Sequence, residues 1–222
     1  MRKPVENFAK DIGRPDPAGR LDAPSFHRNK EGITAELIRL LGDGHGDVLE
    51  IGSGTGQHAV TFAAALPDLT FWPSDPVSDH IGSIDAWRTA SGLGNVMPAT
   101  SLNCCERPWR LGQRDLRPNN LDAVIAINVI HIAPWAVAEA IIEGAKEYLK
   151  SGGAMIFYGP YRKNGQHNSQ GNIDFDAALR ARNPSFGIRD LEDLMACADR
   201  NGLRFESETD LPANNKMIVF RA

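Results

Sequence analysis

A short apolar run leads directly into a glycine-rich turn and then into a helical pattern in the segment VLEIGSGTGQHA, residues 48–59. Glycine permits such a tight turn and lets a ligand approach the main chain closely. The spacing is G-x-G-x-G, whereas a dinucleotide-binding fingerprint requires glycine at position 57, which is Gln57. A Walker loop would require a lysine after the turn, and none follows. The segment therefore predicts a strand-turn-helix unit with a ligand at the turn, the alternative being a turn that only joins the two elements.

Short apolar runs alternate with helical patterns along the rest of the chain. We predict helices at 25–44 (capped by Ser25), 55–66, 77–91, 134–150 and 189–202, and strands at 48–51, 69–75, 96–102, 121–128 and 154–159. The last two apolar runs, 203–210 and 216–222, have no helix between them and must pair as an antiparallel hairpin. This order predicts an α/β fold with a doubly wound sheet and a ligand at the carboxyl ends of its strands.

The length of 222 residues, with 42% hydrophobic residues, predicts one domain over residues 25–222. Residues 1–24 carry four prolines and nine charged residues, which predicts a flexible arm or a lid. The polar insert 161–187 follows the fifth strand and is longer than a usual connection, so we expect it to cap the substrate.

Composition argues against several classes of partner. A net charge of -4 without a long run of like charge argues against nucleic acids and acidic membrane surfaces. The apolar runs are too short to span a bilayer. No secretory signal is visible and three cysteines cannot form a disulfide framework, so we predict a cytoplasmic protein. The adjacent Cys104 and Cys105 lack further ligands at zinc spacing, and no catalytic triad or HExxH pair is visible, so we predict no metal site.

Two strand ends carry candidate functional residues. Asp75 ends the second predicted strand, where a carboxylate accepts hydrogen bonds from both ribose hydroxyls of a nucleotide cofactor. The alternative for Asp75 is an N-cap of the helix that begins near Val77, a role that could hold at the same time. Asn128 and His131 follow the fourth strand and face the cleft if that strand ends near Ile127. A satisfied structural histidine is the alternative for His131.

The G-x-G-x-G turn with a preceding acid resembles motif I of the class I S-adenosylmethionine-dependent methyltransferases, whose sheet has seven strands. The resemblance implies that the turn packs against the ribose and methionine part of the cofactor and that Glu50 orders the turn and places the cofactor's ammonium group. It also implies that Asn103 contacts the adenine, where related enzymes often have Asp, and that cofactor and substrate meet near Asn128. The turn residues concerned are Gly52, Ser53, Gly54 and Gly56.

Several longer segments are similar to the methyltransferase-like protein 26 family, from about Ala23 to the C-terminus. They are VLEIGSGTGQHAVTFAAALPDLTFWPSDP, LDAVIAINVIHIAPW, YGPY, FDAALRARNPSFGIRDLEDL and LPANNKMIVF. The segment HRNKEGI occupies the family's RNxxPI-like position, with Gly32 where proline is usual. This resemblance implies that Arg28 and Asn29 contact the cofactor carboxylate or belong to a lid, a surface salt bridge being the alternative for Arg28. It leaves the methyl acceptor open.

Methyl transfer from a sulfonium is an in-line displacement that needs a dry, closed pocket, and a base only if the acceptor is protonated. We predict a small-molecule acceptor with a thiol, amine or acidic hydroxyl, and S-adenosylhomocysteine as the second product. The catalytic candidates are His131 and Tyr161. The substrate-binding candidates are His27, Trp135, Asn172, Asn214 and Asn215. Asn214 and Asn215 are equally suited to a hairpin turn. An NAD-dependent oxidoreductase and a non-catalytic cofactor-binding protein are the alternative functions, and a homodimer stays open.

Overall fold

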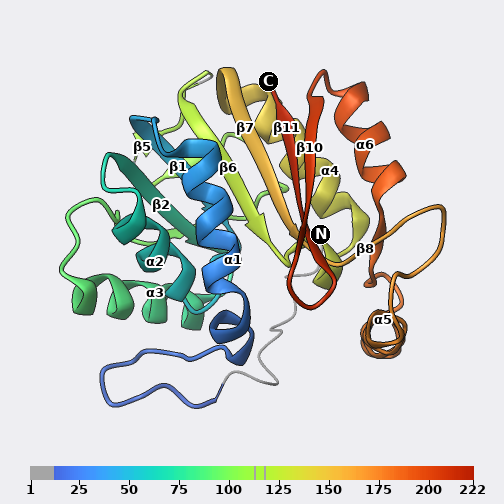
Figure 1. Ribbon diagram of the computed structural model, residues 1–222. Coiled ribbons are helices and arrows are strands. Elements are labelled where there is room, and N and C mark those ends of the chain that lie inside the picture. The colour runs from blue at the N-terminus through green and yellow to red at the C-terminus, as the bar shows by residue number, and fades with distance from the viewer. Residues whose placement is uncertain (1–12, 113, 118) are drawn as a thin grey trace.

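The computed structural model describes residues 13–112, 114–117 and 119–222, and its centre is one seven-stranded sheet (Figure 1). The strand order is β10-β11-β7-β6-β1-β2-β3. Strands β3, β2, β1, β6 and β7 run parallel, and β11 runs antiparallel to β7 and to β10. The predicted doubly wound α/β sheet with a C-terminal antiparallel hairpin is therefore confirmed. The strands are β1 Gly46–Ile51, β2 Leu69–Asp75, β3 Thr100–Ser101, β6 Leu121–Ile127, β7 Leu149–Gly159, β10 Arg204–Leu211 and β11 Asn215–Arg221.

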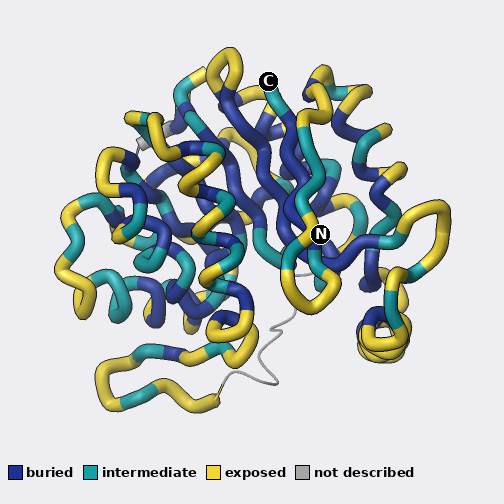
Figure 2. The backbone as a smooth tube through the Cα atoms, in the orientation of Figure 1, coloured by how far each residue is buried: buried dark blue, intermediate teal, exposed yellow. Residues whose placement is uncertain are grey.

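Helices cover both faces of this sheet because its central strands are apolar on both sides. On one face, α1 (Pro24–Leu41) and α2 (Gln57–Ala65) pack on side chains such as Val48 and Phe71. On the other face, α4 (Trp135–Tyr148) and α6 (Leu191–Arg200) pack on alternate side chains such as Leu49. Helix α3 (Ser78–Ser91) lies beside α2 and β2 (Figure 1). The sheet interior is accordingly buried, as Figure 2 shows.

The structure adds elements that the sequence pattern did not predict. Two short strand pairs lie outside the main sheet: β4 (Arg110–Leu111) with β5 (Arg114–Asp115), and β8 (Tyr161–Arg162) with β9 (Arg189–Asp190). The 3-10 turn η1 (Ile130–Ile132) precedes α4. The polar insert 161–187 contains helix α5 (Gln170–Arg182), which lies at one end of the molecule, away from the centre of the sheet (Figure 1). Ser169 caps α5 by accepting a hydrogen bond from the Asn172 amide at 3.2 Å.

Several predicted element boundaries are wrong. Helix α1 begins at Pro24 with Ala23 as its N-cap, because proline suits the first turn of a helix, so Ser25 is not the cap. Helix α2 begins at Gln57 because Gly56 takes a left-handed conformation (φ 88°). Strand β3 has only two residues. Helix α4 ends at Tyr148, before the glycines at 152 and 153, because β7 already begins at Leu149.

Part of the predicted N-terminal arm, residues 1–12, lies outside the described residues. The stretch that precedes α1 is attached to the first residue of α2 and to the second and third turns of α3. The Leu21 amide donates to Ser83 Oγ at 2.8 Å, the Ala23 amide donates to Gln57 Oε1 at 2.8 Å, and Trp87 Nε1 donates to the Leu21 carbonyl at 2.9 Å. This segment therefore borders the end of the sheet where the glycine-rich turn lies. No helix in the described ranges is long and apolar enough to cross a membrane.

Candidate functional site

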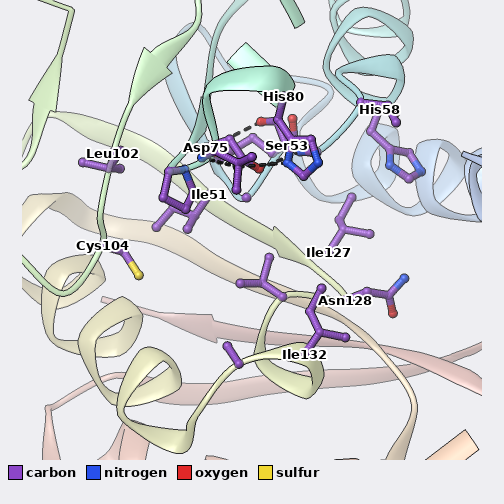
Figure 3. A pocket seen from close by; sticks show the side chains of 18 of the residues that line it. Ile51, Ser53, His58, Asp75, His80, Leu102, Cys104, Ile127, Asn128 and Ile132 are labelled. Atoms are coloured by element: carbon purple, nitrogen blue, oxygen red, sulfur yellow. Dashed lines mark hydrogen bonds and ion pairs between the residues drawn. The ribbon is translucent and has the colours of Figure 1, made fainter. Parts of the chain in front are cut away.

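A cavity of about 200 Å³ opens at the carboxyl ends of β1, β2 and β6 (Figure 3). This is the end of a parallel sheet at which doubly wound folds bind ligands. The glycine-rich turn, the end of β2, the segment after β3 and the segment after β6 form its walls. Its lining includes Ala23, Ser25, Glu50, Gly52, Ser53, Gly54, His58, Asp75, His80, Leu102, Asn103, Cys104, Asn128, Val129, Ile132, Ala133 and Val137.

The three glycines of the turn have positive φ values of 69°, 56° and 88°, which side chains rarely adopt. At Gly52 a Cβ atom would lie 2.7 Å from Val129 Cγ2, and at Gly56 it would lie 2.6 Å from the Ile84 Cα. These two glycines therefore permit close packing within the protein. A Cβ on Gly54 would meet no described atom within 4 Å, so this glycine is the one that leaves space for a ligand.

Glu50, at the carboxyl end of β1, is a buried carboxylate in the cavity wall. Its Oε2 has no hydrogen-bond partner in the part of the chain that the structure describes. Burial raises the pKa of Glu50 to about 7, a hydrogen bond with Ser53 opposes this change, and the charge of Asp75 reinforces it. An unpaired buried carboxylate is costly, so this position favours a ligand that brings a positive charge.

Asp75, at the end of β2, already accepts three hydrogen bonds. The Gly54 amide donates to Oδ2 at 3.0 Å, the Val77 amide donates to Oδ1 at 2.9 Å, and His80 Nδ1 lies 3.0 Å from Oδ1 (Figure 3). A carboxylate offers roughly four acceptor positions, so about one is free. His80 is itself buried and lines the cavity, and its Nε2 has no partner among the described residues. Asp75 and His80 therefore form one unit with unused hydrogen-bonding capacity.

His58, in the first turn of α2, is a second histidine of the cavity wall. Its Nε2 lies 2.9 Å from Asn29 Oδ1, and its ring stacks on Phe62 with 5.3 Å between ring centroids. Burial lowers the pKa of His58 to about 4. The imidazole is therefore neutral at pH 7, and the contact with an amide oxygen requires the proton on Nε2, which leaves Nδ1 as an acceptor.

The opposite wall begins where β6 ends, at Ile127. Asn128 has a left-handed backbone (φ 58°), which asparagine tolerates better than most residues, and its amide donates to the Tyr158 carbonyl of β7 at 2.8 Å. The wall continues through apolar residues to Asn103, whose amide is engaged within its own loop: Nδ2 donates to Glu106 Oε1 at 2.8 Å. The cavity thus has a polar side at the glycine-rich turn and a mainly apolar side opposite.

A family model described as "Protein of unknown function (DUF938)" matches residues 20–222. The chain belongs to the DUF938 family. The family description assigns no activity, and it names no relation to the methyltransferase-like protein 26 family, so that resemblance stays a prediction for this DUF938 protein.

Solved structures of methyltransferases share the fold of the DUF938 protein. The mitomycin 7-O-methyltransferase MmcR matches with a TM-score of 0.72 and 15% identity over 89% of this chain and 54% of that chain. A putative O-methyltransferase from Nostoc punctiforme matches with a TM-score of 0.71 and 15% identity, over 87% of this chain and 55% of that chain. The DUF938 chain spans about half the length of these structures.

The O-methyltransferase NcsB1 from neocarzinostatin biosynthesis matches with a TM-score of 0.69 and 18% identity, over 89% of this chain and 54% of that chain. That structure contains S-adenosylmethionine and 2-hydroxy-5-methyl naphthoic acid. At this level of identity the likeness shows that the DUF938 protein has a methyltransferase fold, which agrees with the predicted class I fold.

The structure places the two predicted catalytic residues outside the cavity wall, which corrects their expected position in the cleft. His131 and Tyr161 are fully buried, with ring centroids 5.2 Å apart in an edge-to-face contact. The His131 ring occupies the space that a Cβ on Gly159 would need. Burial lowers the pKa of His131 to about 3 and raises the pKa of Tyr161, and neither polar end has a hydrogen-bond partner in the described structure.

The predicted N-terminal contacts lie beside the cavity and not in its wall. Asn29 reaches the site through His58, whereas Arg28 is exposed and acts on the hydroxyl of Tyr158 only through its charge. His27 is exposed and pairs with Asp22 at 2.7 Å. The residues that line the cavity from this segment are Ala23 and Ser25.

The predicted substrate residues other than His27 come together at two other places. The Asn172 side chain of α5 donates to the Asn214 carbonyl in the β10–β11 turn at 3.3 Å, and Asn215 Nδ2 donates to the Pro212 carbonyl at 3.2 Å. The first bond attaches the insert to the hairpin, the second lies within the hairpin turn, and none of the three asparagines lines the cavity. Trp135 lines a separate cavity beside α6.

The sequence interpretation missed His58 and His80 as site residues. Both stand in the first turn of a helix that follows a strand end, at spacings that were visible: His58 is two residues after Gly56, and His80 is five residues after Asp75. First-turn residues of such helices lie at the ligand end of the sheet. No group of three or more His, Cys, Asp or Glu residues within the described ranges is arranged to hold a metal ion.

Proposed function

We propose that this DUF938 protein is an S-adenosylmethionine-dependent methyltransferase that acts on a small-molecule nucleophile. The observation that carries the proposal is the cavity at the ends of β1 and β2, where the open Gly54, the unpaired Glu50 carboxylate and the Asp75–His80 unit meet. The methyltransferase fold supports the same conclusion. When bound, the cofactor supplies an electrophilic methyl group on a sulfonium.

The donor and acceptor chemistry of the wall fits this cofactor. Glu50 offers to the cofactor's ammonium group a buried carboxylate oxygen that has no hydrogen-bond partner among the described residues. The space at Gly54 admits the ligand close to the main chain. Leu102, Val137 and neighbouring apolar side chains form a surface that suits the adenine ring.

Asp75 and His80 share the recognition of the two ribose hydroxyls. Asp75 has about one acceptor position free, because three N–H groups already use the others. In the tautomer in which His80 donates Nδ1–H to Asp75, Nε2 presents a lone pair, and this nitrogen has no partner among the described residues. We therefore assign one hydroxyl to the Asp75 carboxylate and the other to His80 Nε2.

The cavity also offers a hydrogen-bond acceptor for the group to be methylated. His58 is neutral at pH 7, it lines the cavity, and its contact with Asn29 leaves Nδ1 free to accept a hydrogen bond from that group. Because burial disfavours the charged imidazole, His58 orients the group and is not a strong base. The apolar wall excludes water from the acceptor. NcsB1 was solved with a hydroxylated aromatic acid, so we propose a phenolic hydroxyl as the first acceptor class to examine, before thiols and amines.

The decisive experiment is a parallel calorimetric titration with S-adenosylmethionine, S-adenosylhomocysteine and NAD. We expect micromolar binding of the first two and no binding of NAD, followed by methylated products from a screen of phenols, thiols and amines. The Gly54→Val variant fills the open space and should lose binding, whereas Gly94→Ala, which changes a glycine outside the cavity, should retain it. Binding of NAD alone would refute the proposal.

A further inference from the structure

A second cavity, of about 350 Å³, lies between the start of α4, the β8–β9 pair and α6. The segment 130–135 separates it from the cavity described above. Ala133 lines the first cavity, and its carbonyl accepts a hydrogen bond from Arg189 in the second. The second cavity is polar, and four of its lining side chains are arginines: Arg162, Arg180, Arg189 and Arg200.

Positive charge in this second cavity is only partly neutralised. Arg162 pairs with Asp190, Arg180 pairs with Asp176 at 3.0 Å, and Asp193 also lines the cavity. Four guanidinium groups therefore face three carboxylates, even when Asp176, outside the lining, is included. Burial lowers the pKa of Arg189, and repulsion from the nearby arginines adds to this change. Arginines that repel one another in a cavity favour an anionic ligand.

Arg189 is held in place before any ligand arrives. Its Nε donates to the Ile130 carbonyl at 2.9 Å, and its Nη2 donates to the carbonyls of Ala133 and of Ser185, the latter at 2.9 Å. The guanidinium also lies over the Trp135 ring, 5.9 Å from its centroid. No described residue accepts a hydrogen bond from its Nη1. A guanidinium fixed in this way loses little conformational freedom on binding.

Arg162 provides a second unused donor. Its Nε is buried and has no hydrogen-bond partner in the described ranges, although its Nη2 pairs with Asp190. A buried N–H without a partner is unfavourable, so an incoming oxygen atom would stabilise it. Two fixed arginines with free N–H groups, together with Arg180 and Arg200 at the more exposed side, form a forked donor set of the kind that binds oxyanions.

We propose that this arginine-lined cavity is a binding site for the phosphate or carboxylate group of a small ligand, separate from the cofactor cavity. Arg189 and Arg162 supply the fixed donors, and Trp135 supplies an apolar wall for the uncharged part of the ligand. The proposal stands on this cavity alone and does not depend on methyl transfer.

The experiment titrates the full chain with inorganic phosphate and, in parallel, with citrate, each against sodium chloride at equal ionic strength. Tryptophan fluorescence reports the binding, and Trp135→Phe identifies the responding ring. Arg200→Gln and Arg180→Gln remove charge from exposed positions of the cavity and should each weaken binding about five- to tenfold. Arg39→Gln removes the same charge from an exposed site on α1 and is the matched control.

Saturable binding of phosphate alone supports the site and assigns a phosphate ester, and binding of citrate alone supports the site and assigns a carboxylate. Binding of both supports a general oxyanion site. The absence of saturation with either ion would overturn the proposal. So would equal affinities for Arg200→Gln, Arg180→Gln and Arg39→Gln, because binding would then occur elsewhere.

Discussion

Glu50 should release a proton when the cofactor cavity is filled. In the free protein, burial raises the pKa of this carboxyl from 4.5 to about 7, so about half of the molecules carry the proton at pH 7. An ammonium group next to the carboxylate favours the ionised form and lowers this pKa by roughly 1–3 units. Binding of S-adenosylhomocysteine at pH 7 is therefore expected to release about half a proton per protein molecule.

The same pKa difference sets the effect of Glu50 on stability. The folded protein holds this proton more tightly than the unfolded chain does. Glu50 therefore contributes stability that is fully present below pH 4.5 and is lost as pH rises through 7. The loss amounts to about 3 kcal/mol. The wild type should therefore lose about this much free energy of unfolding as pH rises from 4.5 to 8, and Glu50→Gln should not show this loss.

Calorimetric titration in buffers of different ionisation enthalpy measures the released proton directly. The released fraction should lie between about 0.4 and 0.9 near pH 6, according to how far the ammonium group lowers the pKa, and fall to about one tenth or less at pH 8, because the free carboxyl titrates near pH 7. Glu50→Gln should bind more weakly and should release no proton. Glu31→Gln changes an exposed residue of α1 and should behave as the wild type. Proton release that is absent in the wild type, or unchanged in Glu50→Gln, would refute the assignment of Glu50 to the ammonium group.

Three further predictions concern the site and the core. Asp75→Asn should weaken S-adenosylhomocysteine binding about 10- to 100-fold in calorimetry. Asp79→Asn changes an exposed residue and should leave the affinity unchanged. Equal affinities of the two variants would remove Asp75 from the site. In urea unfolding, Gly144→Ala should lower the free energy of unfolding by about 1–3 kcal/mol, because its methyl group meets a core indole ring. Gly82→Ala lies in open space on α3 and should raise the free energy of unfolding by about 0.5–1 kcal/mol. The reverse order of the two variants would contradict this packing. Burial lowers the pKa of His131 from 6.5 to about 3, so the unfolded chain takes up this proton at a higher pH than the folded protein does. As pH falls from 8 to 5, the free energy of unfolding of the wild type should therefore decrease by about 2 kcal/mol more than that of His131→Phe. The same pH dependence in both proteins would show that His131 is not the group responsible.

The fold could be predicted from the sequence because parallel strands leave a clear pattern. Runs that are apolar on both faces, such as β6, belong in the centre of such a sheet. Two final strands without a helix between them must form a hairpin. Helix α5 was missed because its residues are mostly polar and few are buried, so its amphipathic pattern is weak. The short pair β8–β9 was missed because residues far apart in the chain form it.

The site was predictable only in part. The glycine-rich turn, Glu50 and Asp75 follow local sequence patterns, and the structure brings them to one cavity. We expected His131 in the cleft because it follows the end of β6. Gly159 has no side chain, however, and this leaves room for the His131 ring in a buried position outside the cavity. That position depends on a contact between β7 and η1, which a single sequence does not reveal. His80 was overlooked although its spacing from Asp75 was visible.

The close approach of Gly52 to Val129 has a consequence for folding. A Cβ at position 52 would lie 2.7 Å from the Val129 side chain, which follows β6, and β6 pairs with β1 in the centre of the sheet. The two walls of the cavity therefore come from segments about 77 residues apart, and they meet only when this pairing is complete. A partly folded chain without β6 has no cavity to fill. Saturating ligand should consequently lengthen the lifetime of the folded protein while leaving the rate of folding unchanged.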